Sequence, residues 1–358
     1  LSNKNFELVS GAPEILSEFN DSKNIKEELL NSIIEINTGI CDDIDHIVSD
    51  LKEHISKAII VAESKGYSLA SIATHPFAKW EDQSVTKCER YLNFVDKMQW
   101  PLRRLLITGV HVHIGVESGE KAIAITNALT SYIPIMIGLS SNSPFFGGEL
   151  TGLASTRSKI FEGLPTSGLP PVLKNYSEFK RLMRTLKKAK SISTIREIWW
   201  DIRPHPGFGT VEVRVFDSVP TIEHAAALAA LTQSLVVMLS EKYDNASKQF
   251  LLDEWIIREN KWRATRYGLD AKIIIDDNGS QLELKHFALE TLYKLKPISK
   301  SLGCLKYINI LENYICNDIV FSKKQIELYD KNKDFTDILK YSIQQLKLGC
   351  EINDKSMA

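Results

Sequence analysis

The chain has 358 residues, enough for one large domain or two ordinary ones, and its 44% hydrophobic and 25% charged residues are typical of a globular protein. A net charge of −1 argues against a nucleic-acid partner recognised through overall basic charge. The five cysteines show no CxxC spacing, so we expect no disulfide framework or zinc–cysteine site, and a cytoplasmic location. No apolar run approaches about 20 residues, so no membrane association is expected.

Hydrophobic spacing predicts the first elements. A helix is expected over 44–62, ended by Gly66, and alternation over 110–116 predicts a strand with one apolar face. A further helix is predicted over 119–133, up to the following proline. Residues 140–171 are rich in Ser, Gly, Pro and Thr without a sustained period, which predicts a long loop, and such loops are usually functional.

The second half begins with a predicted helix over 176–190 and two predicted strands, Ile195–Arg203 and Thr210–Phe216. The remaining pattern is mostly helical. Because strands cluster in the first two thirds of the chain, we predict an α+β fold with a sheet core at about 1–220 and a mostly helical part at 221–358.

Two predicted strands carry polar residues on one face. His111 and His113 would project to the same side, which suits a metal or phosphate site or, alternatively, a hydrogen-bonded polar sheet face. A metallohydrolase is disfavoured because neither a third histidine nor an HExxH-like helix accompanies the pair. Glu212 and Arg214 would face away from three valines, either as bound or paired buried charges or as a cross-strand pair on a solvated face.

Other charged residues leave two interpretations open. Glu35, among isoleucines, is a candidate metal ligand or the polar side of an edge strand, and Glu28 would share its face only if the backbone between them bends. Arg263 and Arg266, one helical turn apart, form an anion clamp or a solvated basic face. The hydroxyls, amides and guanidinium of 140–157 suit carboxylates or phosphates, or form a polar lid without a ligand.

No Walker A, GxGxxG or GxSxG motif occurs, which removes the main sequence support for P-loop, Rossmann and α/β-hydrolase chemistry. Instead, eight segments occur in a familiar order: Glu35-Ile-Asn-Thr-Gly39, Thr74-His-Pro-Phe77, Gly109-Val-His-Val-His-Ile-Gly115, Ser140-Ser-Asn-Ser-Pro144, Thr151-Gly-Leu-Ala-Ser-Thr-Arg157, Trp200-Asp-Ile-Arg-Pro204, Thr210-Val-Glu-Val-Arg214 and Trp262-Arg-Ala-Thr-Arg-Tyr-Gly268. Over about residues 6–275 this series resembles the type 2 glutamate–cysteine ligase family, especially its bacterial carboxylate–amine ligase branch.

The resemblance implies a single catalytic ligase domain over 1–358 with a glutamine-synthetase-like fold, in which an antiparallel sheet forms a half-open funnel flanked by helices. It implies an ATP- and Mg²⁺-dependent reaction. The γ-carboxylate of glutamate, or a similar carboxylate, takes the γ-phosphoryl group of ATP, and the amine of cysteine or another amine attacks the resulting acyl phosphate. Positioning and charge stabilisation dominate such phosphoryl transfer. A homodimer is also expected from the resemblance.

The resemblance also assigns roles to individual residues. The implied metal ligands are Glu28, Glu35, His113 and Glu212. The implied catalytic residues are Arg157 and Arg214, and the implied substrate-binding residues are Ser143, Thr151, Arg157 and Arg203. The implied nucleotide contacts are His111, Arg263 and Arg266.

The chain departs from the family pattern at its beginning. The family opens with a strand reading about Gly-x-Glu-x-Glu, whose carboxylates also bind metal, and no such run precedes Phe6. We expect that this strand is omitted from the sequence, since Leu1 is not a natural start. If the protein truly lacks it, a catalytically weakened homologue that binds nucleotide or amino acid as a sensor or partner becomes the alternative. Asn31 replaces a glutamate that many relatives carry.

Overall fold

A three-stranded antiparallel sheet in the order β3–β9–β8 occupies the centre of the fold. We describe it from a computed structural model that covers residues 5–19 and 22–352. Two-residue and three-residue strands form four additional pairs around this sheet. The strands are β1 (Ile25–Glu27), β2 (Ile34–Ile36), β3 (Gly109–Gly115), β4 (Phe145–Phe146), β5 (Glu149–Leu150), β6 (Ser167–Gly168), β7 (Trp199–Trp200), β8 (Ile202–His205), β9 (Thr210–Asp217), β10 (Lys272–Ile274) and β11 (Gln281–Glu283).

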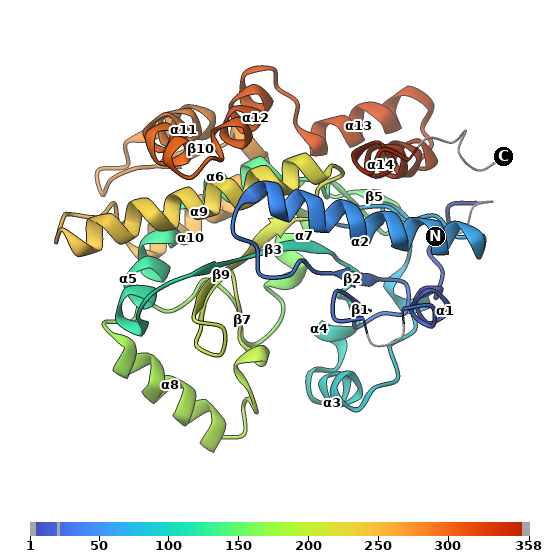
Figure 1. Ribbon diagram of the computed structural model, residues 1–358, viewed down its shortest axis with the longest axis horizontal. Coiled ribbons are helices and arrows are strands. Elements are labelled where there is room, and N and C mark those ends of the chain that lie inside the picture. The colour runs from blue at the N-terminus through green and yellow to red at the C-terminus, as the bar shows by residue number, and fades with distance from the viewer. Residues whose placement is uncertain (1–4, 20–21, 353–358) are drawn as a thin grey trace.

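Helices cover one side of the sheet and leave the other side largely open (Figure 1). In that view α2, α6, α9 and the C-terminal helices lie above β3 and β9, whereas α8 and the α3–α4 pair lie below, on opposite sides. The helices are α1 (Ala12–Leu16), α2 (Ile44–Ser64), α3 (Glu89–Met98), α4 (Trp100–Arg103), α5 (Gly119–Leu129), α6 (Ile133–Ser140), α7 (Thr156–Phe161), α8 (Tyr176–Lys188), α9 (Ile222–Asp244), α10 (Glu254–Tyr267), α11 (Leu284–Ser301), α12 (Leu305–Cys316), α13 (Phe321–Asn332) and α14 (Thr336–Gly349).

The alternation of β9 explains why the sheet has two different faces. Val211, Val213 and Val215 are at most 3% exposed and belong to the main core cluster, which also contains residues of α6 and α9. Successive strand residues point to opposite faces, so Glu212 and Arg214 must face the open side. The predicted α+β class and the antiparallel central sheet are confirmed. Among the strand pairs given above, only β6–β7, which lies outside the central sheet, is parallel. Parallel pairing requires a long connection, and α8 lies in the connection between these two strands.

The boundaries of α2 follow local chemistry. The Asp43 carboxylate accepts a hydrogen bond from the His46 backbone N–H at 2.8 Å, which caps the first turn. Gly66 adopts φ +82° just beyond the last turn, a conformation that glycine tolerates best. The predicted helix over 44–62 is therefore confirmed, with its end two residues later.

Three sequence predictions of secondary structure are wrong. In the first, residues 119–133 are helical as predicted, but the helix does not end at the proline: α5 passes through a 3₁₀ turn into α6, and Pro134 occupies the first turn of α6, which needs no proline N–H. Residues 140–171 are not a structureless loop, since they contain β4, β5, α7 and β6. The predicted strand Ile195–Arg203 is divided into a 3₁₀ turn, β7 and the start of β8.

Two helical runs, Gly119–Ser140 and Ile222–Asp244, are long and apolar enough to cross a membrane by length and composition alone. The expectation that no apolar run approaches this length is therefore wrong. Inside the protein, 89% and 72% of their most apolar windows are buried. This burial explains their composition, because a helix packed on all sides within a core needs apolar residues around its circumference.

Acid stability tests the packing of α9. His224 is 3% exposed, its Nε2 lies 2.8 Å from the Leu139 carbonyl oxygen, and burial lowers its pKa to about 4. Because the unfolded chain binds this proton near pH 6.5 and the folded protein does not, stability falls between pH 6.5 and 4. From pH 7 to 5 we expect the wild type to lose about 2 kcal/mol more unfolding free energy than His224→Asn, measured by urea unfolding. His286→Asn, an exposed change on α11, is the control and should lose as much unfolding free energy from pH 7 to 5 as the wild type. If His224→Asn also lost as much as the wild type, the prediction would be contradicted.

Candidate active site

Glu212 lies on β9, the central strand of the sheet, and its side chain is on the side of the sheet opposite to the valine core. Its neighbours in register are His113 on β3 and Arg203 on β8. Arg203 Nε donates to Glu212 Oε2 at 2.6 Å, and Arg214 Nη1 donates to Oε1. Glu212 is only 1% exposed, so these two guanidinium groups compensate a carboxylate that water does not solvate.

The charges around Glu212 decide its protonation. Burial alone raises the pKa of a carboxyl group, but the Arg214 and Arg203 charges outweigh this effect and hold the pKa of Glu212 well below its usual range. Glu212 is therefore ionised at neutral pH. The alternative of an ion pair on a solvated sheet face is wrong, because the pair is buried.

A β-bulge places the two histidines beside this cluster. The register of β3 against β9 shifts between Val110 and Val112, so that two residues of β9 lie opposite His111. His113 Nε2 lies 3.6 Å from Glu212 Oε1, and its Nδ1 lies 3.0 Å from Thr210 Oγ1. Water reaches both rings, but the surrounding protein lowers the pKa of each histidine and favours neutral imidazole, the form that can ligate a metal.

The β1–β2 hairpin settles how Glu28 relates to Glu35. Antiparallel pairing of Lys26 with Glu35 turns the chain back, so Glu28, the residue directly after β1, comes near Glu35. Burial and then the Glu35 charge raise the pKa of Glu28 to about 7, and the Arg214 charge acts in the opposite direction. The hairpin therefore brings two carboxyl groups toward the same open face as Glu212.

Arg157 lies inside the protein, beside β3 and β9. It is 2% exposed, and its Nη1 and Nη2 atoms donate to the carbonyl oxygens of Val215 and Arg214 at 3.3 and 3.1 Å. A side chain at Gly109 would collide with this guanidinium, which explains the glycine there. The Phe161 ring lies 5.5 Å from the Arg157 guanidinium and 6.0 Å from that of Arg214. Arg157 thus supports the backbone of β9 at Arg214 and Val215.

Asp217, which the sequence motifs did not single out, holds the polar segment after α6 in place. Its buried carboxylate accepts hydrogen bonds from the Asn142 N–H at 2.9 Å and from the Ser143 and Ser155 hydroxyls at 2.7 Å each. Thr151 Oγ1 donates to the Pro144 carbonyl oxygen at 3.0 Å. The two predicted substrate-binding hydroxyls, of Ser143 and Thr151, are therefore hydrogen-bonded within this segment.

The α10 arginines are not joined to the Glu212 cluster by any contact among the described residues. Arg263 Nε donates to Glu259 at 2.8 Å and its Nη1 donates to the Lys272 carbonyl oxygen at 3.0 Å. Arg266 packs on the Tyr267 ring at 4.8 Å. Their expected nucleotide contacts stay predictions. The same helix carries a buried cation that the sequence did not suggest, Lys261, which lies 2.6 Å from Asp201 and 2.5 Å from Glu162 and links α10 to the sheet.

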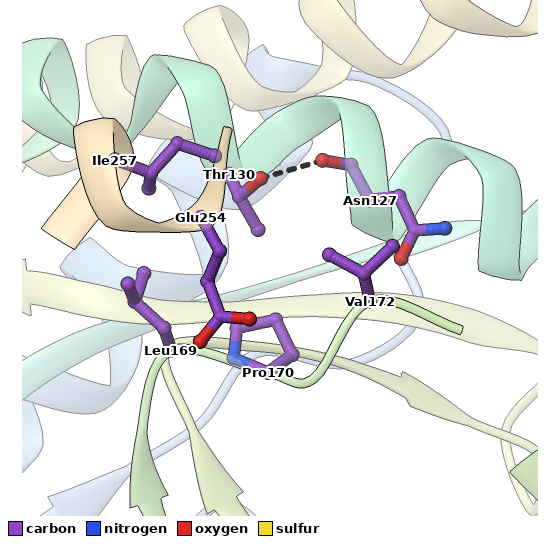
Figure 2. A pocket seen from close by; sticks show the side chains of 7 residues that line it. All are labelled: Asn127, Thr130, Leu169, Pro170, Val172, Glu254 and Ile257. Atoms are coloured by element: carbon purple, nitrogen blue, oxygen red, sulfur yellow. Dashed lines mark hydrogen bonds between the residues drawn. The ribbon is translucent and has the colours of Figure 1, made fainter. Parts of the chain in front are cut away.

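Two cavities have very different capacities. The one in Figure 2, between Asn127, Thr130 and Glu254, holds about 10 Å³, room for about one water molecule. The other, about 610 Å³, lies between α8 and the turn joining β8 to β9, and its lining includes Lys180, Arg184 and Lys187. His205 at the end of β8 and Phe208 in this turn have stacked rings, which lie 5.8 and 5.6 Å from the ring of His113. A large cationic cavity therefore adjoins the histidine side of the site.

The donor set suits a divalent cation on the β1–β2 side of the face. Glu28 and Glu35 repel each other, and a hard cation such as Mg²⁺, which prefers carboxylate oxygens, would relieve that repulsion. Both oxygens of Glu212 instead accept guanidinium N–H groups. These two hydrogen bonds leave a further lone pair on each oxygen, so the role of Glu212 as a metal ligand stays a prediction.

Charge removal at Glu212 tests the buried cluster. Glu212→Gln keeps the shape but leaves Arg203 and Arg214 without their counter-charge, a loss that typically costs about 3–5 kcal/mol. We expect the free energy of unfolding, measured with urea, to fall by about 3 kcal/mol. Glu149→Gln on exposed β5 is the control, with a change below about 0.5 kcal/mol. Wild-type stability of Glu212→Gln would contradict the compensation described above.

Comparisons with known proteins agree on one family. The sequence model described as "Glutamate-cysteine ligase family 2(GCS2)" matches residues 7–317. The chain is 43% identical over 304 residues, 85% of this chain and 76% of the relative, to "Putative glutamate--cysteine ligase 2" of Thermobifida fusca. It is 39% identical over 334 residues, 93% and 87% of the two chains, to "Putative glutamate--cysteine ligase 2-1" of Frankia casuarinae.

The fold has a counterpart among solved structures. The crystal structure of a glutamate–cysteine ligase from Francisella tularensis in complex with AMP superposes with a TM-score of 0.71 over 92% of this chain and 82% of that one. At 14% sequence identity this similarity shows the fold alone. The match over residues 7–317 and the identities to the curated relatives show more: the chain belongs to glutamate–cysteine ligase family 2.

Proposed function

We propose that this protein is an ATP- and Mg²⁺-dependent carboxylate–amine ligase that activates the γ-carboxylate of glutamate, or a similar carboxylate, as an acyl phosphate and joins it to the amine of cysteine or another amine. Family membership supports the reaction class. One observation carries the proposal further: the Glu28–Glu35 acid pair lies close enough to Arg214, which binds Glu212, for the Arg214 charge to lower the pKa of Glu28.

This juxtaposition suits phosphoryl transfer, which requires compensation of negative charge more than a protein nucleophile. Glu28 and Glu35 would hold Mg²⁺, and the bound ion would neutralise the triphosphate. Buried Arg214 Nε has no hydrogen-bond partner among the described residues, so this N–H is available to an anionic oxygen. Arg214 would stabilise charge on the transferred phosphoryl group, and Arg157 would position Arg214 by holding its backbone carbonyl.

Substrate binding is supported by the surroundings of the face. The AMP in the Francisella ligase structure supports a nucleotide site on this fold. The cationic cavity beside α8 offers a place for an anionic portion of a substrate. Neutral His113, between this cavity and Glu212, would contact metal or phosphate.

The proposal includes one catalytic domain over 1–358 in the cytoplasm. A core cluster that combines residues from Ile44 to Phe321 supports the single domain. All five cysteines are free thiols, which supports a reducing compartment.

A second candidate function is binding of nucleotide or amino acid without turnover, as a sensor or partner. The observation that favours it is the pairing of both Glu212 oxygens with arginines, because the two guanidinium groups offset the negative charge that would attract a metal ion. The two candidates differ in a measurable property, the release of ADP.

The first test incubates the full chain with Mg-ATP and glutamate, with and without cysteine or a panel of other amines. We expect amine-dependent ADP release, with an equal amount of amide identified by mass spectrometry. Hydroxylamine in place of the amine should yield the hydroxamate, because it traps an acyl phosphate. Binding of nucleotide without ADP release with any amine would favour the second candidate.

The metal assignment predicts the behaviour of Glu35→Gln. Glu35 is exposed, so its replacement should leave thermal stability unchanged, but loss of one carboxylate ligand should raise the Mg²⁺ concentration for half-maximal ADP release at least about tenfold. Glu27→Gln, an exposed change on the neighbouring strand, is the matched control and should keep the wild-type Mg²⁺ dependence. Identical Mg²⁺ curves for both variants would remove Glu35 from the site.

A further inference from the structure

A cysteine, a histidine and an aspartate meet where the chain leaves β2 and enters α2. Cys41 lies in the connecting segment, and His46 and Asp50 lie one turn apart on the first part of α2. One potential ligand atom from each residue lies within 4.8 Å of the other two. These residues lie outside the Glu212 cluster, and the family resemblance assigns them no role.

The separations are close to those of a tetrahedral metal site. Cys41 Sγ lies 3.8 Å from Asp50 Oδ2, and His46 Nε2 lies 3.6 Å from Asp50 Oδ1. With zinc–sulfur bonds of about 2.3 Å and zinc–nitrogen or zinc–oxygen bonds of about 2.0–2.1 Å, tetrahedral ligand atoms are about 3.3–3.6 Å apart. The two distances above run to different oxygens of Asp50, and the ligand atoms of Cys41 and His46 lie within 4.8 Å of each other, so side-chain rotations would bring one oxygen, the sulfur and the nitrogen onto one ion.

The backbone already holds the ligands in place. The Gly39 N–H donates to Asp50 Oδ2 at 2.8 Å, which fastens the segment before Cys41 to the helix. The Asp43 cap fixes the first turn, which contains His46. Cys41 and Asp50 are half-buried and His46 is exposed, so an ion could enter from solvent and keep a water molecule as a fourth ligand.

The ligand chemistry selects the class of metal. A thiolate and an imidazole favour a borderline or soft transition-metal ion over Mg²⁺, which prefers oxygen ligands alone. Such an ion would displace the thiol proton and join the segment after β2 to α2. Because Cys41 follows Glu35 by only six residues, this cross-link would restrain the strand that carries Glu35.

We propose that Cys41, His46 and Asp50 form a second metal site, specific for a transition-metal ion of the Zn²⁺ class, that fastens the end of β2 to α2. The site is separate from the proposed Mg²⁺ site in position and in ligand type. Its occupancy can be measured without any assay of ligase activity, so its failure and the failure of the proposed function are distinguishable.

The test titrates the full chain, freed of metal with a chelator, with Co²⁺ as a spectroscopic probe of Zn²⁺ sites. We expect one equivalent to bind with a thiolate-to-Co²⁺ charge-transfer band that one equivalent of Zn²⁺ abolishes. Cys41→Ser should lose the band, and His46→Asn and Asp50→Asn should each weaken Co²⁺ binding at least about tenfold. Cys316→Ser, at an exposed cysteine on α12, is the matched control and should keep the wild-type spectrum and affinity.

Thermal unfolding gives a second measurement. Saturating Zn²⁺ should raise the Tm of the wild type and Cys316→Ser by at least about 2 °C, and should leave the Tm of Cys41→Ser unchanged. The proposal is overturned if the wild type shows no charge-transfer band, or if Cys41→Ser keeps both the band and the Tm increase. Retained wild-type affinity in His46→Asn and Asp50→Asn would equally overturn the three-residue site.

Discussion

The compensation of the buried Glu212 carboxylate by two arginines is the constraint on which the rest of the site depends. Glu212 and Arg214 lie on β9 and Arg203 lies on the adjacent β8, so the register of β8 against β9 must be correct for the charges to meet. The valine face of β9 fixes that register from the other side, because a slip of one residue would expose the valines and bury the charges against the helices. The strand register therefore determines both the stability of the sheet and the geometry of the site.

The residues around the open face determine its shape and the charges that it presents. Arg157 and Asp217 are buried and hold the backbone of β9 and the segment after α6, so they stabilise the face from inside the protein. The β1–β2 hairpin adds its two carboxyl groups from the side, and α8 with the β8–β9 turn adds positive charge from the other. Negative and positive groups are therefore separated across one face of the sheet.

Hydrophobic periodicity was sufficient to predict a helix or strand where interactions between residues close in sequence determine it. The helices at 44–64 and 176–188 and the strands at 109–115 and 210–217 were predictable, because caps and alternation are encoded by neighbouring residues. The structure of segment 140–171 was not predictable, because it depends on hydrogen bonds from Ser143 and Ser155 to Asp217. These two serines lie about 60–75 residues before Asp217 in the sequence. The parallel β6–β7 pair likewise depends on α8 between its strands.

The sequence by itself determined the family, the α+β class and the set of polar residues worth considering, since short motifs and residue alternation are properties of the chain. Only the tertiary structure decided which of those residues act together. It joined Glu212 to Arg203 and Arg214, turned Glu28 toward Glu35, buried Arg157 against the backbone of β9, and paired Arg263 with Glu259. The physical reason is that charge compensation and burial depend on distances in space, which residues far apart in sequence establish only when the core has packed.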